Sequence, residues 1–278
     1  MSDEIFSEYD PLHAALYVYD VWKAYDGVPA LSGLSLYVRK DEILGLIGPN
    51  GSGKTTTIKI ILGLIKKDRG VVNVLGYDID KNPIEYKQFI GYVPEAATLP
   101  EYLTAYEFLY YVGRIRGVPE KILKDRIEYL LKMFHLEDKK RELLISLSKG
   151  MKQKLAFSSS LICEPKLLLL DEPFIGVDPE GQYEIKSFLK RLSGEGCSIL
   201  LSTHLLDFAE RFCDRVAIIS RGKNVATGDL EHLKQRVSRE KNTTLEQIFL
   251  TLTKEREMES VNDERTVGRK GFFKLFKR

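Results

Sequence analysis

The sequence predicts an α/β fold whose sheet is largely parallel. Short apolar runs of the length of buried strands alternate along the chain with longer amphipathic stretches, which is the pattern of strands joined by helices. One such run, Ile43 to Ile47, leads into a glycine-rich stretch and then into a helix-like run over residues 56–64. Parallel sheets place ligand sites at the carboxyl ends of their strands, so we expect a site where this run ends.

The glycine-rich stretch has the spacing of a phosphate-binding loop, because residues 48–55 match G-x-x-x-x-G-K-[ST]. Glycines let the backbone curl so that its N–H groups converge on phosphate oxygens at a helix N-terminus. Lys54 adds a mobile cation, and the Thr55 hydroxyl is suited to hold Mg²⁺. The alternative is a glycine-rich turn before an incidental lysine, but the strand before it and the helix after it favour nucleotide binding. The expected nucleotide contacts are Gly48, Pro49, Asn50, Gly51, Ser52, Gly53, Lys54, Thr55 and Thr56.

The composition is that of an ordinary globular protein, with 278 residues, 44% hydrophobic and 29% charged. No run approaches the roughly 18 apolar residues that span a bilayer, and the first residues are acidic where a signal peptide is basic. Three widely spaced cysteines without C-x-x-C argue against a disulfide framework and a zinc site. The net charge is +2, but five positive charges and no acid follow Gly268, so the rest of the chain carries a net charge of −3. We therefore expect no nucleic-acid partner. We expect a chain that stays in the cytosol.

Ahead of the loop, residues 1–14 are polar and acidic and form an expected N-terminal lead. Apolar, β-branched and aromatic residues over 16–22 and alternating residues over 34–38 then predict strands. Between them Tyr25 precedes the turn signal Asp26-Gly27, where an exposed ring can stack on a purine. The alternative for this tyrosine is ordinary packing beside a turn.

After the loop, short strands are predicted over residues 70–76 and 89–93. Thr104 and Glu107 have the spacing of a capping box, and Ile127, Leu130 and Phe134 share one helical face. We therefore expect a mainly helical insert over residues 96–163.

Two further buried strands deliver polar residues to the same edge of the sheet. The run over 167–170 ends in Asp171 and Glu172, and the run over 198–202, which follows a helix over 182–192, leads to His204. A helix over 205–212, strands over 216–219 and 223–227, a helix capped by Asp229 and a last helix near 245–253 follow. Carboxylates after a buried strand are costly unless they are used, which indicates a functional site.

The last 25 residues differ in composition from the rest of the chain. Residues 254–267 are rich in charge and linker-like, and residues 268–278 interleave aromatic residues with cations. This tail is expected to contact the membrane or a membrane subunit, with a disordered soluble end as the alternative.

Phosphoryl transfer needs charge neutralisation, a metal holder and a group that orients water. Lys54 fits the first role, Thr55 with Asp171 the second, and Glu172 the third. His204 is the expected γ-phosphate contact. The alternative for Asp171 and Glu172 is a purely structural carboxylate pair, and the alternative for His204 is a core histidine whose hydrogen bonds are satisfied within the protein.

These residues resemble the ATP-binding subunit of ABC transporters, over about residues 16–253 and in that family's motif order. The matching positions are Tyr25 for the adenine-stacking aromatic, Gly48 to Thr55 for Walker A, Glu95 for the Q-loop, Leu147 to Met151 for the signature, Leu167 to Glu172 for Walker B, Gly176 to Asp178 for the D-loop and His204 for the switch histidine.

The resemblance implies a P-loop NTPase core with a largely parallel sheet, an antiparallel β subdomain and a mainly helical subdomain that carries the signature. It implies an ATPase domain over 15–253 in which Lys54, Glu172 and His204 are catalytic and Thr55, Glu95 and Asp171 hold Mg²⁺. Two copies would sandwich two ATP molecules, each contacted by the other copy's signature and D-loop, through Ser148, Gly150 and Asp178. A related second subunit in place of the second copy is the alternative.

Two residues depart from the family pattern. Glu95 stands where glutamine is usual, which would place a further anion near Mg²⁺, and the signature reads Leu-Ser-Lys-Gly-Met over 147–151. Residues 147–155, 92–95, 171–174 and 245–249 resemble exporter-type subunits of the ABC-2 and Ecs-like groups. This resemblance implies a peripheral protein on the cytoplasmic face of the cell membrane, bound to a polytopic membrane subunit. An importer subunit, a soluble ABC ATPase and a non-hydrolysing ATP-gated clamp are the alternatives.

Overall fold

The computed structural model describes residues 14–237 and 243–253. The expected N-terminal lead therefore lies almost wholly outside the described residues, and the linker and tail over 254–278 lie entirely outside them.

The central element is a six-stranded sheet in the order β10-β9-β3-β8-β7-β6. Its strands are β3 (Ile43–Ile47), β6 (Ile90–Val93), β7 (Leu167–Asp171), β8 (Ser198–Thr203), β9 (Arg215–Ser220) and β10 (Lys223–Gly228). All neighbouring pairs are parallel except β9 with β10. The carboxyl ends of β3, β7 and β8 consequently meet at one edge, as the α/β prediction requires.

A second, antiparallel sheet has the order β2-β1-β4-β5. It consists of β1 (Ala14–Tyr25), β2 (Val28–Arg39), β4 (Arg69–Val74) and β5 (Tyr77–Asp78). The apolar residues over 16–22 form part of one long strand, β1, whose pairing with β2 shifts register between Val18 and Val21. Asp20 lies inside this irregularity at a φ of +47°, so the strand continues past a bulge.

The helices join the strands in the expected alternation. α2 (Lys54–Ile61) follows the glycine loop and begins two residues earlier than the predicted run, and α6 (Pro179–Gly194), α7 (Leu206–Phe212) and α8 (Leu230–Val237) follow later strands. Residues 245–253 are also helical. Between β6 and β7 lie α3 (Ala105–Ile115), α4 (Glu120–Met133) and α5 (Lys149–Leu161), with short 3₁₀ turns over Glu137–Lys139 and Leu144–Ser146; another such turn, Glu85–Phe89, precedes β6.

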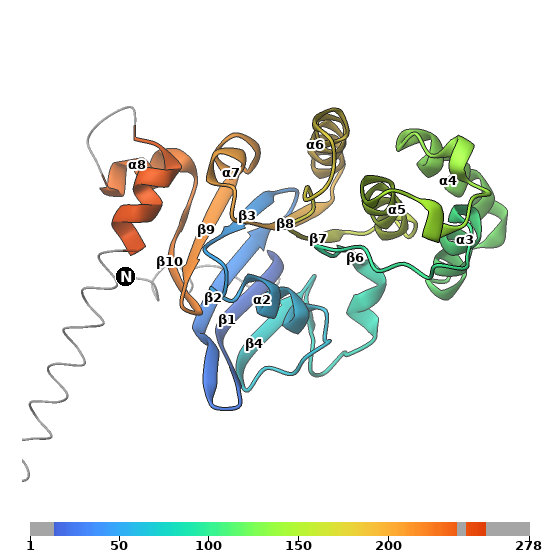
Figure 1. Ribbon diagram of the computed structural model, residues 1–278. Helices are drawn as coiled ribbons and strands as arrows, with labels where there is room; N and C mark the ends of the chain where they lie inside the picture. Colours follow the sequence, from blue (N-terminus) through green and yellow to red (C-terminus); the bar gives the residue numbers. More distant parts are fainter. Residues whose placement is uncertain (1–13, 238–242, 254–278) are drawn as a thin grey trace, which may run out of the picture.

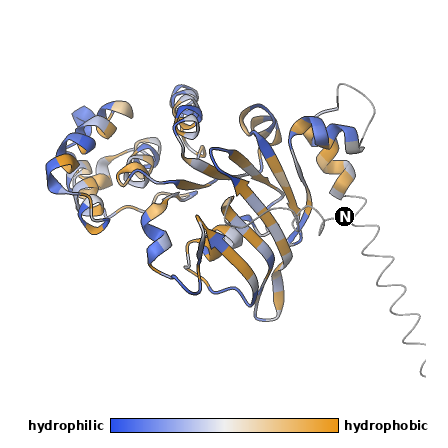
Figure 2. Cartoon of the chain, turned by 180° about the vertical axis from the view of Figure 1, so that it is seen from behind, coloured by the Kyte–Doolittle hydropathy of each residue, from blue (hydrophilic) through white to orange (hydrophobic). Residues whose placement is uncertain are grey.

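Both faces of the six-stranded sheet are covered. Figure 1 shows α6 and α7 over one face, α2 and the antiparallel sheet against the other, and α3, α4 and α5 together at one side. Along β7 the side chains alternate between these layers, because Leu167 and Leu169 belong to the cluster with α2, and Leu168 and Leu170 to the cluster with α6. Apolar residues accordingly concentrate in the strands when the chain is coloured by hydropathy (Figure 2). A run buried on both faces explains why β7 is continuously apolar.

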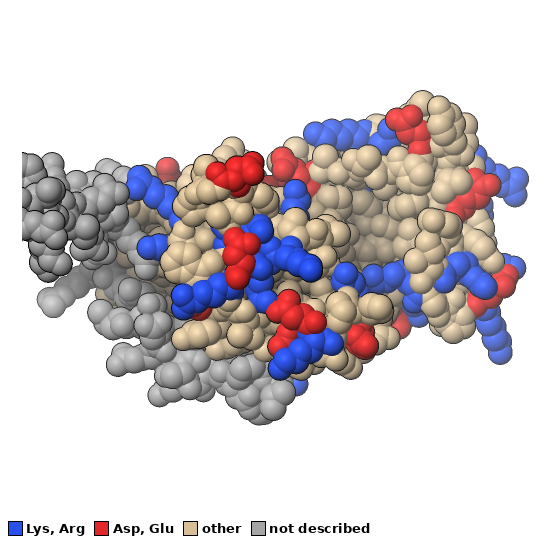
Figure 3. Space-filling view, turned by 90° about the horizontal axis from the view of Figure 1, so that it is seen from below, with Lys and Arg blue, Asp and Glu red and all other residues tan. Residues whose placement is uncertain are grey.

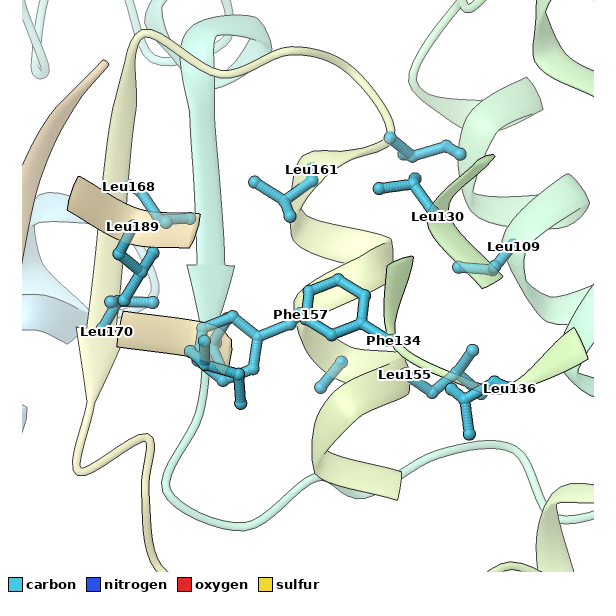
Figure 4. Close-up of a cluster of buried hydrophobic side chains, with 14 of the residues drawn as sticks. Leu109, Leu130, Phe134, Leu136, Leu155, Phe157, Leu161, Leu168, Leu170 and Leu189 are labelled. Atoms are coloured by element: carbon cyan, nitrogen blue, oxygen red, sulfur yellow. The ribbon is translucent and has the colours of Figure 1, made fainter. Parts of the chain in front are cut away.

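Helix α5 belongs to the core on both of its sides. In Figure 4, Phe157 and Leu161 of α5 lie between Leu168 and Leu170 of β7 and the side chains Leu109 and Phe134. All of these residues form one buried cluster. Apolar packing therefore fixes α5 both to the sheet and to α3 and α4.

Across the described residues, no helix combines the length and the apolar character that crossing a bilayer requires. On the face seen in Figure 3, lysine and arginine side chains lie intermingled with aspartate and glutamate side chains.

Candidate active site

The glycine loop follows β3 and has a shape that side chains would obstruct. A Cβ on Gly48 would lie 2.3 Å from the carbonyl oxygen of Ile219 and 2.6 Å from the Ser52 hydroxyl. Gly53, the N-cap of α2, has a φ of +109°, where L-residues are strained. Its Cβ would also meet the backbone and side chains of β2 at Ala30 and Leu31. The loop thus needs glycine at these two positions for both close approach and backbone conformation.

Lys54 is buried and lies across the loop. Its Nζ donates to the carbonyl oxygens of Gly48 (2.8 Å) and Pro49 (3.3 Å) and lies 3.7 Å from Oε1 of Glu172. Close by, the Ser52 hydroxyl is buried and has no hydrogen-bond partner among the described residues. An orphaned hydroxyl beside a buried ammonium and a helix N-terminus fits a phosphate group.

Asp171 and Glu172 follow from the pairing of β7 with β8. Asp171 is the last residue of β7 and lies opposite Ser202, whose hydroxyl donates to Oδ1 of Asp171. The backbone N–H of Glu172 donates to the Ser202 carbonyl oxygen at 3.1 Å. Glu172 itself has a φ of +46°, a sparsely populated region for a non-glycine residue. The chain therefore turns sharply between the two carboxylates, which gives them different surroundings.

His204 comes directly after β8 and meets Glu172. Its Nδ1 lies 2.9 Å from Oε1 of Glu172. The histidine side chain is 45% exposed and the glutamate side chain 9%. The imidazole therefore lies between a buried carboxylate and solvent, a position from which its other nitrogen can reach a ligand.

The three expected metal ligands are spread around the strand ends. Thr55 is exposed in the first turn of α2, Asp171 is buried, and Glu95 is exposed after β6. Burial, together with the negative charges of Asp171 and Glu95, raises the pKa of Tyr92 to about 12. Both carboxylates therefore act on one side chain of β6. Within 14–237 and 243–253, no three His, Cys, Asp or Glu side chains converge as a metal site. Thr55, Asp171 and Glu95 are therefore few and dispersed ligands, which suits Mg²⁺ because this ion keeps waters and phosphate oxygens as further ligands.

The remaining predicted residues do not join this cluster within one chain. Ser148 is exposed at the N-cap of α5, and its hydroxyl accepts the Met151 N–H at 3.2 Å. Asp178 is exposed at the N-cap of α6 and accepts the Gly181 N–H at 3.1 Å. A Cβ on Gly150 would lie 3.1 Å from the carbonyl oxygen of Gly176, so the signature and D-loop turns pack together.

Tyr25, the predicted adenine-stacking residue, is the last residue of β1. Its side chain is exposed, and Nζ of Lys23 lies 5.6 Å from its ring centroid. The ring belongs to the hairpin of β1 and β2, whose second strand approaches the loop at Gly53.

Two polar residues near the site were missed by the sequence reasoning. One is Ser202, the partner of Asp171, which only the register of β7 and β8 identifies. The other is Gln153 on α5, which is buried and whose Nε2 donates to the carbonyl oxygens of Pro94 (3.0 Å) and Pro173 (3.3 Å). The available signal for Gln153 was a polar residue on the helix that follows the signature.

Comparison with known proteins identifies similar sequences. A family model described as "ABC transporter" matches residues 31–175. The chain is 36% identical to the ABC-type transporter ATP-binding protein EcsA of Bacillus subtilis over 243 residues, which cover 86% of this chain and 97% of that protein. It is 36% identical to the Nod factor export ATP-binding protein I of Ralstonia nicotianae over 206 residues, which cover 74% of this chain and 64% of that protein.

Solved structures of ATP-binding cassettes have a similar fold. An ATP-binding subunit of an ABC transporter superposes with a TM-score of 0.81 at 34% identity, covering 86% of this chain and 99% of that one. A dimeric ATP-binding cassette in a post-hydrolysis state with ADP and Pi has a TM-score of 0.72 at 25% identity, covering 77% and 98%.

Proposed function

This chain belongs to the ABC transporter family as an ATP-binding subunit with ATP hydrolase activity, and from this premise we propose that two copies close over ATP to drive export through a separate membrane subunit. The proposal assigns a role to each residue of the candidate site. It also assigns the exposed signature turn to the partner copy.

The observation that carries the catalytic assignment is the sharing of one carboxylate oxygen. Oε1 of Glu172 lies 2.9 Å from His204 Nδ1 and 3.7 Å from Lys54 Nζ. The Lys54 ammonium is surrounded by two loop carbonyl oxygens and this carboxylate, so anionic phosphate oxygens in the loop would compete for it. Lys54 then neutralises phosphate charge, and Glu172 is free to accept a hydrogen bond from the attacking water.

His204 has two functions in this scheme. Its Nδ1 side holds the carboxylate of Glu172, which limits the positions that this carboxylate can take. Its exposed side offers a hydrogen bond to the terminal phosphate. The histidine therefore links the group that orients water to the phosphate that is attacked.

Mg²⁺ supplies charge neutralisation between the phosphates when it is bound. The residues that would hold it are Thr55, Asp171 and Glu95. The Ser202 hydroxyl orients Asp171 for this role by donating to Oδ1.

A second copy would complete the site. Ser148 and Asp178 are exposed caps of α5 and α6. The N-terminus of α5 presents backbone N–H groups that suit a phosphate anion. A two-fold pair of identical chains gives two equivalent sites, each with one loop and one signature. The dimeric cassette with ADP and Pi, which has the same fold, supports this arrangement.

Export and the membrane partner follow from the relatives. One protein of similar sequence is named for export of Nod factor and another is the transporter subunit EcsA. We assign to this chain a peripheral position at the cytoplasmic face of the cell membrane, bound to a polytopic subunit. The test is to purify the tagged chain from gently solubilised membranes and to measure ATP turnover with and without the accompanying protein. A polytopic partner that stimulates turnover supports the proposal; only soluble partners would remove the transport assignment.

A further inference from the structure

We propose that Gln153 is a positioning residue that ties the signature helix α5 to the two turns that carry Glu95 and Glu172. This inference rests on the proposed function, because it assumes that those two carboxylates act in ATP hydrolysis. It assigns a role to a side chain that touches neither the nucleotide loop nor His204.

The contacts of Gln153 are specific. The residue is 2% exposed, and Nε2 donates to the carbonyl oxygen of Pro94 at 3.0 Å and to that of Pro173 at 3.3 Å. Pro94 directly precedes Glu95, and Pro173 directly follows Glu172. An amide nitrogen carries two hydrogens, so each carbonyl receives one of them and the donor is fully used.

Each of these two prolines can offer only its carbonyl oxygen to α5. Proline has no backbone N–H, so the carbonyl oxygen is the only backbone hydrogen-bonding group at each of these positions. Without the amide, the buried Pro173 carbonyl and the partly buried Pro94 carbonyl would each lose a donor, and the turns would shift to find water. A shift of the turn after Glu172 moves a carboxylate whose Oε1 must stay near His204 and Lys54.

Helix α5 itself does not depend on this amide. The side chains Leu155, Phe157 and Leu161 bury α5 in the large apolar cluster, as Figure 4 shows. The hydrogen bonds of Gln153 therefore add a directional link to a helix that is already packed. Their loss is expected to change the position of the two turns more than the stability of the helix.

This link connects the two parts of α5's surroundings that act in the proposed function: the signature turn, which would meet the partner copy's ATP, and the turns that carry the two carboxylates. Ser148 is the N-cap of α5, so the residue that would meet the partner's ATP and the residue that holds both carboxylate turns are on one rigid helix. A movement of α5 when the signature engages ATP is then transmitted to Glu95 and Glu172 through one amide. Gln153 is accordingly expected to affect the rate of hydrolysis rather than the affinity for ATP.

The test compares Gln153→Met, which keeps an unbranched side chain of similar length without donors, with the parent full-length chain. The control is Ser158→Ala, because Ser158 is fully buried on the same helix and its hydroxyl donates to the carbonyl oxygen of Lys154 in that helix. We expect Gln153→Met to lower kcat by about tenfold or more per ATP-binding site, while KM and the Kd of ATP change by less than about twofold. The control is expected to keep parental values.

A second variant adds a readout that a purely structural role would not produce. In Gln153→Glu, a protonated carboxyl regains one donor, so kcat relative to the parent should rise as pH falls from about 8 to about 6. A flat ratio, a Gln153→Met kcat within about twofold of the parent, or a loss of kcat matched by loss of ATP-binding sites would overturn the inference. The parent and Glu172→Gln are measured alongside: if they hydrolyse ATP equally, the catalytic assignment fails as well, whereas a difference between them confines the failure to Gln153.

Discussion

Nδ1 of His204 lies 2.9 Å from Oε1 of Glu172, and the same oxygen lies 3.7 Å from Nζ of Lys54. One buried carboxylate is therefore held between two nitrogen groups from separate strand ends. Lys54 also donates to two carbonyl oxygens of its own loop, so three polar groups surround its ammonium. Phosphate oxygens in the loop are expected to compete with these groups for the ammonium.

The first prediction concerns the switch histidine. His204→Ala removes the nitrogen that holds Glu172, so we expect kcat to fall by about tenfold or more with little change in ATP affinity. His135→Ala is the matched control, because that histidine is 67% exposed and pairs with Glu184 on the surface. Steady-state ATP turnover and equilibrium nucleotide binding measure both variants. Equal turnover in His204→Ala and the control would contradict the assignment.

The second prediction concerns the ATP site that two copies of the chain are proposed to share. Ser148→Arg places a bulky cation at the exposed N-cap of α5, so ATP-dependent dimerisation should be lost. Loss of the cap costs about 1 kcal/mol of stability, which is too little to unfold the chain. Size-exclusion chromatography with ATP in a Glu172→Gln background is the measurement, with Ser187→Arg on the exposed face of α6 as the control. A Ser148→Arg chain that still dimerises would count against a site shared between copies.

The third prediction concerns Glu95. If this carboxylate helps to hold Mg²⁺, Glu95→Gln should raise the half-saturating Mg²⁺ concentration for turnover by severalfold and leave the kcat at saturating Mg²⁺ nearly unchanged. The same change removes a negative charge that raises the pKa of Tyr92, so that pKa should fall. A Mg²⁺ titration of turnover and an ultraviolet titration of tyrosine measure the two effects. An unchanged Mg²⁺ requirement would remove Glu95 from the metal site.

The fourth prediction is a pH dependence of stability. Burial, Asp171 and Glu95 raise the pKa of Tyr92 from 10.0 to about 12 in the folded chain. The unfolded chain loses this proton first, so the contribution of Tyr92 to stability is complete below pH 10 and is lost as pH rises to about 12. Tyr92→Phe should reduce the loss of stability in this window, which denaturant unfolding at several pH values measures. An equal alkaline loss in both chains would show that Tyr92 is not the responsible group.

The fold was predictable from the sequence because its strands are continuously or alternately apolar. The residues at the strand ends were predictable for the same reason: parallel strands bring Gly48, Asp171 and His204 to one edge. Thr104 and Glu107 form the expected capping box, since that motif depends only on local spacing. The extent of β1 was not predictable, because the bulge at Asp20 depends on pairing with β2.

The hydrogen bonds that Ser202 and Gln153 make to distant segments could not be predicted from the sequence either. Ser202 meets Asp171 because β7 and β8 adopt one register among several that their apolar residues allow. Gln153 meets Pro94 and Pro173 because apolar packing brings α5 to the ends of β6 and β7. Neither contact has a local pattern, so only tertiary structure identifies them.

The most direct test of the central claim is ATP turnover and ATP binding by Glu172→Gln beside the parent chain, with Glu195→Gln at the exposed end of α6 as the control. The account predicts that turnover falls by about a hundredfold or more, because the group that orients water is lost, while ATP still binds and holds two copies together. The control should retain parental turnover. Undiminished hydrolysis by Glu172→Gln would contradict the account.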